Sequence, residues 1–241
     1  MLKRGGDVKI LQKGFNYSQD GPGNRLVYHL QGCNFACKWC SNADSIPADN
    51  PKAKNYSVDE IYNEIMRSRM MFFDGGGVTF TGGEACVQAK ELTVLLKMLK
   101  ESGIHTATET NGSFHSLRDI AEYIDYLIVD FKHYDEEQHI RWIGASNKSV
   151  KENLEYFLES GRQIHIRIPV IRGVNDCPDG FVDFFRNYDT SNAVFEFLAY
   201  HEYGKDKWQG NYEIENGFVS AETIKCFTRK FTEHGMKTVS T

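Results

Sequence analysis

Residues 32–42 read GCNFACKWCSN and contain three cysteines, Cys33, Cys37 and Cys40, within eight residues. A structural metal site normally has four protein ligands, whereas a site with three protein ligands keeps one position for a substrate or cofactor. Three thiolates at this spacing on one short loop are typical of a metal centre. The stretch therefore predicts a loop that holds metal and leaves one coordination position open.

Two kinds of metal centre fit the three thiolates. A structural zinc site needs a fourth ligand, for which His29 lies four residues before Cys33. An iron–sulfur cluster with three thiolates instead leaves one iron free, and that iron can take the amino and carboxylate groups of an amino-acid-like ligand. Trp39 and the other apolar residues between the cysteines would exclude water from such a cluster. We favour the cluster.

The whole chain has the composition of a globular protein. Its 241 residues, 41% of them hydrophobic, suffice for one large core, and no linker or repeat divides them, so we expect a single domain over residues 1–241. The net charge of -5 argues against binding nucleic acid or an anionic membrane through bulk electrostatics. The sequence has no apolar signal region and no run of membrane length, so we expect a cytoplasmic protein. The scattered Cys86, Cys177 and Cys226 are given no role.

Strand-like and helix-like patterns alternate along the chain. The spacing of Ser57 with Glu60, and of Ser149 with Glu152, is that of a capping box and predicts the start of a helix at each. This alternation is typical of an α/β fold with a parallel sheet, either open and doubly wound or closed into a complete or partial barrel. The periodicity of apolar residues does not distinguish an open sheet from a barrel. The six predicted strands cover residues 25–30, 77–81, 105–110, 126–131, 163–170 and 193–200.

Polar side chains occur on these strands or directly after them. In parallel α/β folds, ligands bind at the carboxyl ends of the strands, because the connecting loops meet there. Glycines allow a close approach of backbone to a ligand, acidic side chains can bind an ammonium group, and basic side chains can bind a carboxylate. The pattern predicts an amino-acid-like ligand. The residues concerned are Gly82, Gly83, Glu109, Asp130, Lys132, Arg167 and His201.

Several motifs resemble those of the radical S-adenosylmethionine superfamily. The spacing Cys-x-x-x-Cys-x-x-Cys, with an aromatic residue before the third cysteine and GGE after the second predicted strand, is similar to the superfamily pattern. DGPGNR, QGCNFACKWCSN, GVTFTGGEA, GIHTATETNG, VDFK and YHEYGKDKW resemble the glycyl-radical-enzyme activating enzymes, and among those the pyruvate formate-lyase type most closely. The resemblance extends over nearly the whole chain.

The resemblance implies a fold and a chemistry. The fold is a partial (β/α)6 barrel of parallel strands with outer helices, and the cofactors are one 4Fe-4S cluster and S-adenosylmethionine. The implied activity is reductive cleavage of S-adenosylmethionine, followed by abstraction of a hydrogen atom from a glycine of a partner enzyme.

The resemblance also assigns residues to the cofactors. By family position, Cys33, Cys37 and Cys40 bind iron, while Trp39 and Ser41 approach the adenine. The other cofactor-binding residues implied are Gly82, Gly83, Glu109, Asp130, Lys132, Arg167 and His201, and a monovalent cation site would use Glu109, Thr110 and Asp130.

The implied partners are proteins. They are a glycyl radical enzyme as substrate and a flavodoxin or ferredoxin type reductant, and the chain itself is expected to be a monomer. The turn of Asp20, Gly21, Pro22 and Gly23 and the segment YHEYGKDKW are candidates for the partner-contacting surface. Residues 42–56 contain no cysteine, so we expect no ferredoxin-like insert after the cysteine loop.

Two residues depart from the family pattern. Ser41 stands where relatives have histidine, and Glu109 stands where they have aspartate, so the longer side chain is expected to shift or abolish the cation site. Two other functions remain open. One is a radical S-adenosylmethionine enzyme that acts on a small molecule or a peptide, and the other is a zinc-containing binding module without catalysis.

Overall fold

The computed structural model describes residues 5–208 and 212–240, which form two compact units. Unit 1 contains residues 5–34, 44–110 and 115–128, and unit 2 contains the remaining described residues, 35–43, 111–114, 129–208 and 212–240. The boundary between the units passes through the cysteine loop after Asn34. Two elements, η1 (Ala43–Ser45) and β6 (Tyr126–Asp130), contain residues of both units. The single domain over residues 1–241 stays a prediction.

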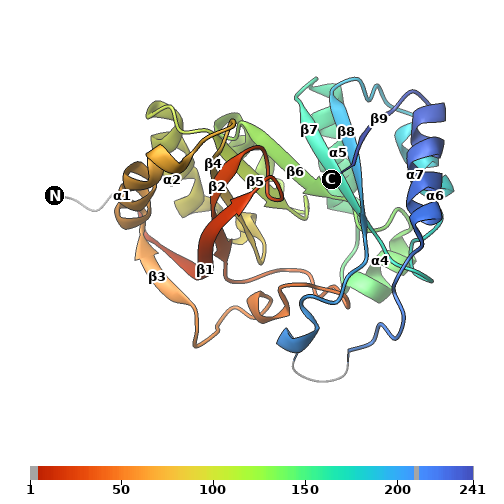
Figure 1. Ribbon diagram of the computed structural model, residues 1–241, viewed down its shortest axis with the longest axis horizontal. Helices are drawn as coiled ribbons and strands as arrows, with labels where there is room; N and C mark the ends of the chain where they lie inside the picture. The colour runs from red at the N-terminus through yellow and green to blue at the C-terminus, as the bar shows by residue number, and fades with distance from the viewer. Residues whose placement is uncertain (1–4, 209–211, 241) are drawn as a thin grey trace. The chain divides into compact units, whose positions relative to one another are not determined.

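Unit 1 is built on a sheet with a parallel part and an antiparallel edge (Figure 1). β2, β4 and β5 run parallel, and Leu30 at the end of β2 pairs with Gly82 at the end of β4. The segments that follow these two strands therefore begin side by side. β1 is antiparallel to both of its neighbours. Across the sheet the order is β3 (Lys54–Ser57), β1 (Asp7–Tyr17), β2 (Asn24–Leu30), β4 (Gly77–Gly82) and β5 (Thr106–Thr110).

Two helices of unit 1, α1 and α2, show the capping and the apolar face that their sequences indicate. α1 starts at the predicted capping box, in which the backbone N–H of Ser57 donates to the Glu60 carboxylate at 2.7 Å and the Ser57 hydroxyl caps the N–H of Glu60. α2 buries its leucines on one face. The bounds are α1 (Val58–Ser68), α2 (Ala89–Glu101), α3 (Leu117–Ile120), η2 (Arg69–Met71), η3 (Ala85–Gln88) and η4 (Ala121–Tyr123).

Unit 2 contains parallel strands (Figure 1), and its core is rich in phenylalanine. Phe185 packs edge to face against Phe131 at 5.5 Å and against Phe195 at 4.8 Å between ring centroids. Aromatic pairs in this geometry add to the stabilisation that comes from burying the rings. The elements are β7 (Ile164–Val170), β8 (Ala193–Ala199), β9 (Lys237–Val239), α4 (Glu136–Ile143), α5 (Lys148–Glu159), α6 (Asp179–Phe185), η5 (Lys205–Lys207) and α7 (Ala221–Glu233).

The six predicted strands are confirmed to within one residue at each end. Three further strands, β1, β3 and β9, are not indicated by the sequence pattern. β1 buries only Val8 and Ile10, so its alternation of apolar and polar residues is short, and the other two strands have four and three residues. Within the described parts of the chain, every helix falls short of the length and apolar character needed to cross a bilayer.

The capping box predicted at Ser149 is wrong. α5 begins at Lys148, and Asn147 occupies the N-cap position. The buried amide of Asn147 donates to the carbonyl oxygens of His133 and Tyr134 at 2.9 and 3.0 Å. Tertiary hydrogen bonds of Asn147 therefore place the N-cap position of this helix two residues before the predicted one.

Arg25 on β2 is fully buried and charged. Its Nε donates to Thr79 Oγ1 and one terminal nitrogen donates to the Val78 carbonyl, both at 2.7 Å, while the other donates to the Pro22 carbonyl at 3.0 Å. Burial lowers the pKa of Arg25 to about 10, and acidic neighbours, Asp20 foremost, oppose this shift. The guanidinium therefore stays protonated at neutral pH and ties the turn before β2 to β4.

We expect Arg25→Lys to lower the free energy of unfolding by about 2–4 kcal/mol, because an ammonium group leaves buried acceptors without donors. Chemical denaturation with urea measures the change. Arg67→Lys, on the exposed side of α1, is the matched control and should change stability by less than about 0.5 kcal/mol. Equal stability of the two variants would contradict the role assigned to Arg25.

Candidate functional site

In unit 1, the GGE turn after β4 is joined to the first residues of the cysteine loop. The backbone N–H of Gly83 donates to the Leu30 carbonyl, and that of Glu84 donates to the Gly32 carbonyl, both at 2.8 Å. A Cβ atom on Gly83 would lie 2.2 Å from the Gly32 oxygen, and one on Gly82 would lie 2.4 Å from the Leu30 nitrogen. Both glycines are therefore required by the close approach of two backbone segments.

Glu84, the acidic residue of the GGE turn, links the segment after β4 to the end of β5 inside unit 1. Glu84 is buried, and its carboxylate accepts from the Cys86 N–H at 2.9 Å and from the Thr110 hydroxyl at 2.7 Å. Burial raises the pKa of the Cys86 thiol, and Glu84 raises it further, so this cysteine stays neutral. Glu84 was not among the predicted site residues. Its signal in the sequence is a carboxylate directly before a short helical turn, where it caps the backbone.

The two predicted cation ligands on β5 already have partners within unit 1. Glu109 accepts from the Thr81 hydroxyl at 2.6 Å, and the Thr110 hydroxyl donates to Glu84 at 2.7 Å. Both residues lie at the carboxyl end of β5, as predicted. The monovalent cation site itself stays a prediction.

The three cysteines of the loop are not joined in disulfides. In unit 1, the N–H of Cys33 donates to the Ile46 carbonyl at 3.0 Å. In unit 2, the N–H of Cys40 donates to the Cys37 carbonyl at 3.1 Å, which closes a tight turn around the buried Trp39. The backbone of each end of the loop is therefore held in place within its own unit.

The last turn of α4 supports the middle of the cysteine loop. The N–H of Ala36 donates to the Ile143 carbonyl at 2.9 Å, and the N–H of Lys38 donates to the Trp142 carbonyl at 3.0 Å. α4 ends at Gly144, whose left-handed conformation turns the chain away. A Cβ atom on Gly144 would lie 3.5 Å from the Cβ of Ala36.

Lys132 brings a positive charge close to two of the cysteines. Its ammonium group donates to the Asp130 carboxylate at 2.7 Å. Burial alone would lower the pKa of Lys132, but Asp130 and the thiolates of Cys37 and Cys40 raise it above its ordinary value. The side chain is therefore charged and stabilises the thiolate form of these cysteines, which is the form that binds metal.

Arg167, predicted to bind a carboxylate, already contacts a buried carboxylate of its own unit. Its Nε donates to Glu196 Oε2 at 2.6 Å, and His165 Nε2 lies 3.0 Å from the same oxygen. The three residues are neighbours on the paired strands β7 and β8. Glu196 was missed by the sequence analysis, although an acidic residue within the apolar run AVFEFLA is the kind of signal that indicates a buried ion pair.

His201 and the segment after it lie beside the cysteine loop in unit 2. The His201 ring stacks on Tyr203 with centroids 4.4 Å apart, and burial lowers the pKa of the imidazole, so it is neutral at neutral pH. A Cβ atom on Gly204 would lie 2.2 Å from the Ser41 carbonyl oxygen, and the Trp208 indole N–H donates to the Cys40 carbonyl at 3.0 Å. The sequence pattern predicted a partner-contacting edge for this segment and did not indicate these contacts.

The predicted partner-contacting turn is largely internal to unit 1. Gly21 and Gly23 are buried, while Asp20 and Pro22 are half-buried. A Cβ atom on Gly23 would lie 2.4 Å from the carbonyl oxygens of Phe73 and Asp74, and Gly23 has a φ of +68°. Gly23 is thus needed for packing, while Gly21 has a φ of +116° that favours glycine.

Exposed apolar side chains surround this turn. Tyr17 packs on Phe73 with ring centroids 6.1 Å apart, and its hydroxyl donates to Asp74 at 3.1 Å. Asn24, at the end of the turn, donates from its side chain to the Met71 carbonyl at 2.7 Å and so connects the two regions. We call this the apolar patch; its members are Phe15, Tyr17, Met70, Met71 and Phe73, each between 46% and 85% exposed.

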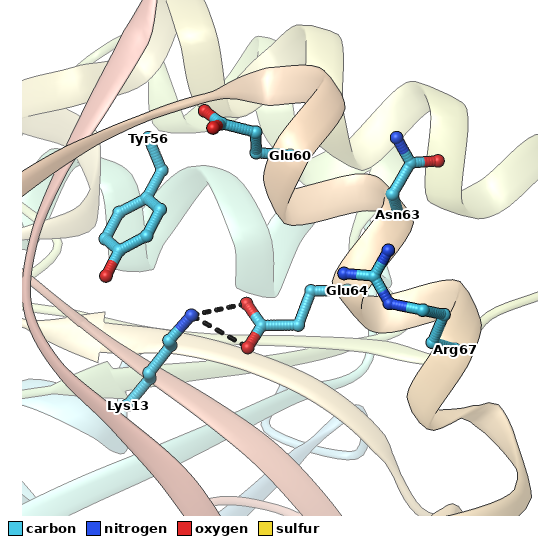
Figure 2. Close-up of a pocket in the computed structure, with 6 residues that line it drawn as sticks. All are labelled: Lys13, Tyr56, Glu60, Asn63, Glu64 and Arg67. Atoms are coloured by element: carbon cyan, nitrogen blue, oxygen red, sulfur yellow. Dashed lines mark hydrogen bonds and ion pairs between the residues drawn. The ribbon is translucent and has the colours of Figure 1, made fainter.

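A separate pocket of about 290 Å³ lies on unit 1 between α1 and the β1 and β3 strands (Figure 2). Lys13 forms an ion pair with both carboxylate oxygens of Glu64, at 2.6 and 2.7 Å, and Tyr28 donates to Glu64 at 2.8 Å. None of the predicted site residues lines it. The lining residues are Lys13, Tyr56, Glu60, Asn63, Glu64 and Arg67.

The donor set of the cysteine loop fits an iron–sulfur cluster. Three cysteines outside any disulfide can supply the thiolates of a cluster with one open iron, while the nearby charged lysine favours the thiolate form and the buried tryptophan gives apolar cover. Within residues 5–208 and 212–240, no three side chains of His, Cys, Asp or Glu form a ready-made metal site. The fit therefore rests on the chemistry of the donors rather than on a preformed coordination geometry.

Comparison with known proteins places the chain among radical SAM proteins. The pattern of the Radical SAM superfamily matches residues 27–185. The pyruvate formate-lyase-activating enzyme of Streptococcus mutans serotype c is 31% identical over 204 residues, which are 80% of this chain and 77% of that protein. The enzyme of the same name from Staphylococcus aureus strain USA300 is 32% identical over 212 residues, which are 82% of this chain and 84% of that protein.

Solved structures of two known proteins are also similar to this chain. A domain of pyruvate-formate lyase-activating enzyme from Bacteroides vulgatus is 26% identical, with a TM-score of 0.58, and the match covers 69% of this chain and 99% of that one. QueE from Escherichia coli has a TM-score of 0.60 over 98% of this chain and 94% of that one, and at 12% identity it shows the fold alone. The predicted fold class, a partial barrel of mostly parallel strands with outer helices, is confirmed.

We expect Gly83→Ala to lower the free energy of unfolding by about 1–3 kcal/mol, because the new methyl group overlaps the backbone of the cysteine loop. Chemical denaturation of the metal-free protein measures the change. Gly14→Ala is the matched control, since a Cβ atom at Gly14 meets no atom within 4 Å. If both variants unfolded at the wild-type denaturant concentration, the packing requirement at Gly83 would be refuted.

Proposed function

Because the chain belongs to the radical SAM superfamily, we propose that it is the activating enzyme of a glycyl radical enzyme, with pyruvate formate-lyase as the partner. The observation that carries this proposal is the identity of 31% and 32% to pyruvate formate-lyase-activating enzymes over 80% and 82% of the chain. The loop of three cysteines, joined by backbone hydrogen bonds to the GGE turn, supports it.

Membership of the superfamily implies a 4Fe-4S cluster and S-adenosylmethionine. When bound, these cofactors supply the one-electron chemistry that removes a hydrogen atom from a glycine of the partner. The protein supplies the thiolates of Cys33, Cys37 and Cys40. The charge of Lys132 favours the thiolate form of Cys37 and Cys40, and the buried Trp39 keeps water away from the loop.

The remaining assignments are part of the proposal. Trp39 and Ser41 approach the adenine. The residues proposed to line the rest of the cofactor are Gly82, Gly83, Glu109, Asp130, Lys132, Arg167 and His201. For Gly82 and Gly83 the contact is through backbone, because neither position accommodates a side chain. A monovalent cation at Glu109, Thr110 and Asp130 would share two of its ligands with existing hydrogen bonds, since the Thr81 hydroxyl donates to Glu109 and the Thr110 hydroxyl donates to Glu84.

The partners follow from the same proposal. The partner enzyme is the protein substrate, a flavodoxin or ferredoxin type protein is the reductant, and the chain acts as a cytoplasmic monomer. We place the contact with the partner enzyme at Asp20, Gly21, Pro22 and Gly23. Because the two glycines are buried, the apolar patch beside the turn would provide most of the contact area.

The decisive experiment is anaerobic activation of the partner. Incubation of the reconstituted protein with pyruvate formate-lyase, S-adenosylmethionine and a strong reductant should produce the doublet of a glycine-centred radical in the electron paramagnetic resonance spectrum. Cys37→Ala should remain folded and produce no doublet, because the core does not depend on that thiol.

Three results separate this proposal from its alternatives. Cleavage of S-adenosylmethionine without a doublet on any glycyl radical enzyme would indicate a small-molecule or peptide substrate instead. Zinc without iron and sulfide in anaerobically purified protein would indicate a binding module. A doublet on a glycyl radical enzyme other than pyruvate formate-lyase would retain the activity and change the partner.

We expect Phe73→Ser to raise the partner concentration needed for half-maximal activation about fivefold to tenfold, because an exposed aromatic ring that anchors an interface contributes a factor of that size. Cleavage of S-adenosylmethionine without partner should be unchanged. Tyr156→Ser, an exposed aromatic residue of α5, is the control. Equal effects of the two substitutions would remove the apolar patch from the interface.

A further inference from the structure

The segment after β8 packs against the second half of the cysteine loop, within unit 2. The Trp208 indole Nε1–H donates to the carbonyl oxygen of Cys40 at 3.0 Å. One residue earlier, Lys207 Nζ donates to the Asn42 side-chain oxygen at 3.0 Å. Gly204 lies so close to Ser41 that a Cβ atom would be 2.2–2.5 Å from three backbone atoms of that residue. Cys40, Ser41 and Asn42 each have a partner in this segment.

The Trp208 ring is itself held by its surroundings. It packs edge to face on Tyr212, with an interplanar angle of 80° and 5.4 Å between ring centroids. The Tyr212 hydroxyl lies 2.8 Å from that of Tyr200, which is buried directly after β8. Tyr200, which follows β8, thus fixes Tyr212, and Tyr212 fixes the orientation of the indole. The indole N–H in turn holds the Cys40 carbonyl oxygen in place.

We propose that Trp208 is a positioning residue for the Cys40 thiolate, and that Lys207 and Gly204 assist it by holding Asn42 and Ser41. The inference rests on the proposed iron–sulfur cluster. A peptide carbonyl fixed by an external donor restricts the backbone dihedrals on either side, and these dihedrals direct the Cα–Cβ bond of the cysteine. Trp208 would therefore reduce the number of directions in which the third thiolate points.

The structure offers a matched control on the other side of the loop. Trp142 also contacts the cysteine loop: its backbone carbonyl accepts from the Lys38 N–H at 3.0 Å, and Lys38 Nζ lies over its ring at 5.6 Å from the centroid, a contact that a phenylalanine ring can keep. Trp142→Phe keeps that carbonyl, whereas Trp208→Phe removes the N–H donor and keeps an aromatic ring against Tyr212. The two substitutions change the same residue type and differ in whether a hydrogen bond to the loop is lost.

The test measures the cluster rather than the activity. Anaerobically reconstituted protein is mixed with a ferrous-iron chelator, and the rate of iron release is followed by absorbance. We expect release about threefold to tenfold faster from Trp208→Phe than from wild type, because one lost hydrogen bond corresponds to about that factor. Trp142→Phe should release iron at the wild-type rate. The electron paramagnetic resonance spectrum of the reduced cluster should broaden only in Trp208→Phe, because the Cys40 backbone then adopts several conformations.

A second variant keeps the test informative if Trp208→Phe folds poorly. Lys207→Met keeps Trp208 and removes the bond to Asn42, and it should accelerate iron release by a smaller factor. Wild-type release from Trp208→Phe, or equal acceleration in Trp208→Phe and Trp142→Phe, would overturn the positioning role and leave the proposed function intact. Wild-type protein that binds no iron would overturn both.

Discussion

The structure depends on the close approach of two backbone segments in unit 1. The parallel register of β2 and β4 places Leu30 opposite Gly82, and the chain after each strand continues in contact through the hydrogen bonds of Gly83 and Glu84. Side chains at these two glycines would occupy the space of backbone atoms. The first residues of the cysteine loop therefore have a defined path, and Cys33 emerges from a rigid sheet edge rather than from a free loop.

Two ion pairs of unit 2 join basic side chains that the sequence predicts to bind the cofactor to carboxylates of the same unit. Lys132 bonds Asp130, and Arg167 bonds Glu196. Because a charge in a poorly solvated site is costly unless it is paired, these pairs keep the lysine and the arginine ionised. Lys132 can then act on Cys37 and Cys40, whose thiolates contribute to its raised pKa. Lys132 therefore pairs with Asp130 and also favours the thiolate form of Cys37 and Cys40.

The glycines of two motifs fit closely against neighbouring segments of the chain, whether or not a ligand binds there. In DGPG, Gly21 and Gly23 fit against Arg25 and the 73–76 loop, and in GGE the two glycines fit against β2 and the cysteine loop. A binding role is compatible with this, because positions without side chains also expose backbone groups to a ligand. The packing nevertheless explains the glycines without a ligand or a partner, so their presence alone is weak evidence for either.

The sequence by itself determined the α/β class, the six main strands, the capping box of α1 and the three-thiol loop, because each depends on residue types at short, regular spacing. The tertiary structure alone decided what depends on residues far apart in the chain. Asn147, not Ser149, occupies the N-cap position of α5, because its amide bonds two carbonyl groups 13 and 14 residues earlier in the chain. Glu196 contacts Arg167 because β7 and β8 are paired in one register. Trp208 bonds Cys40 across 168 positions of sequence, and no local pattern encodes a contact of that separation.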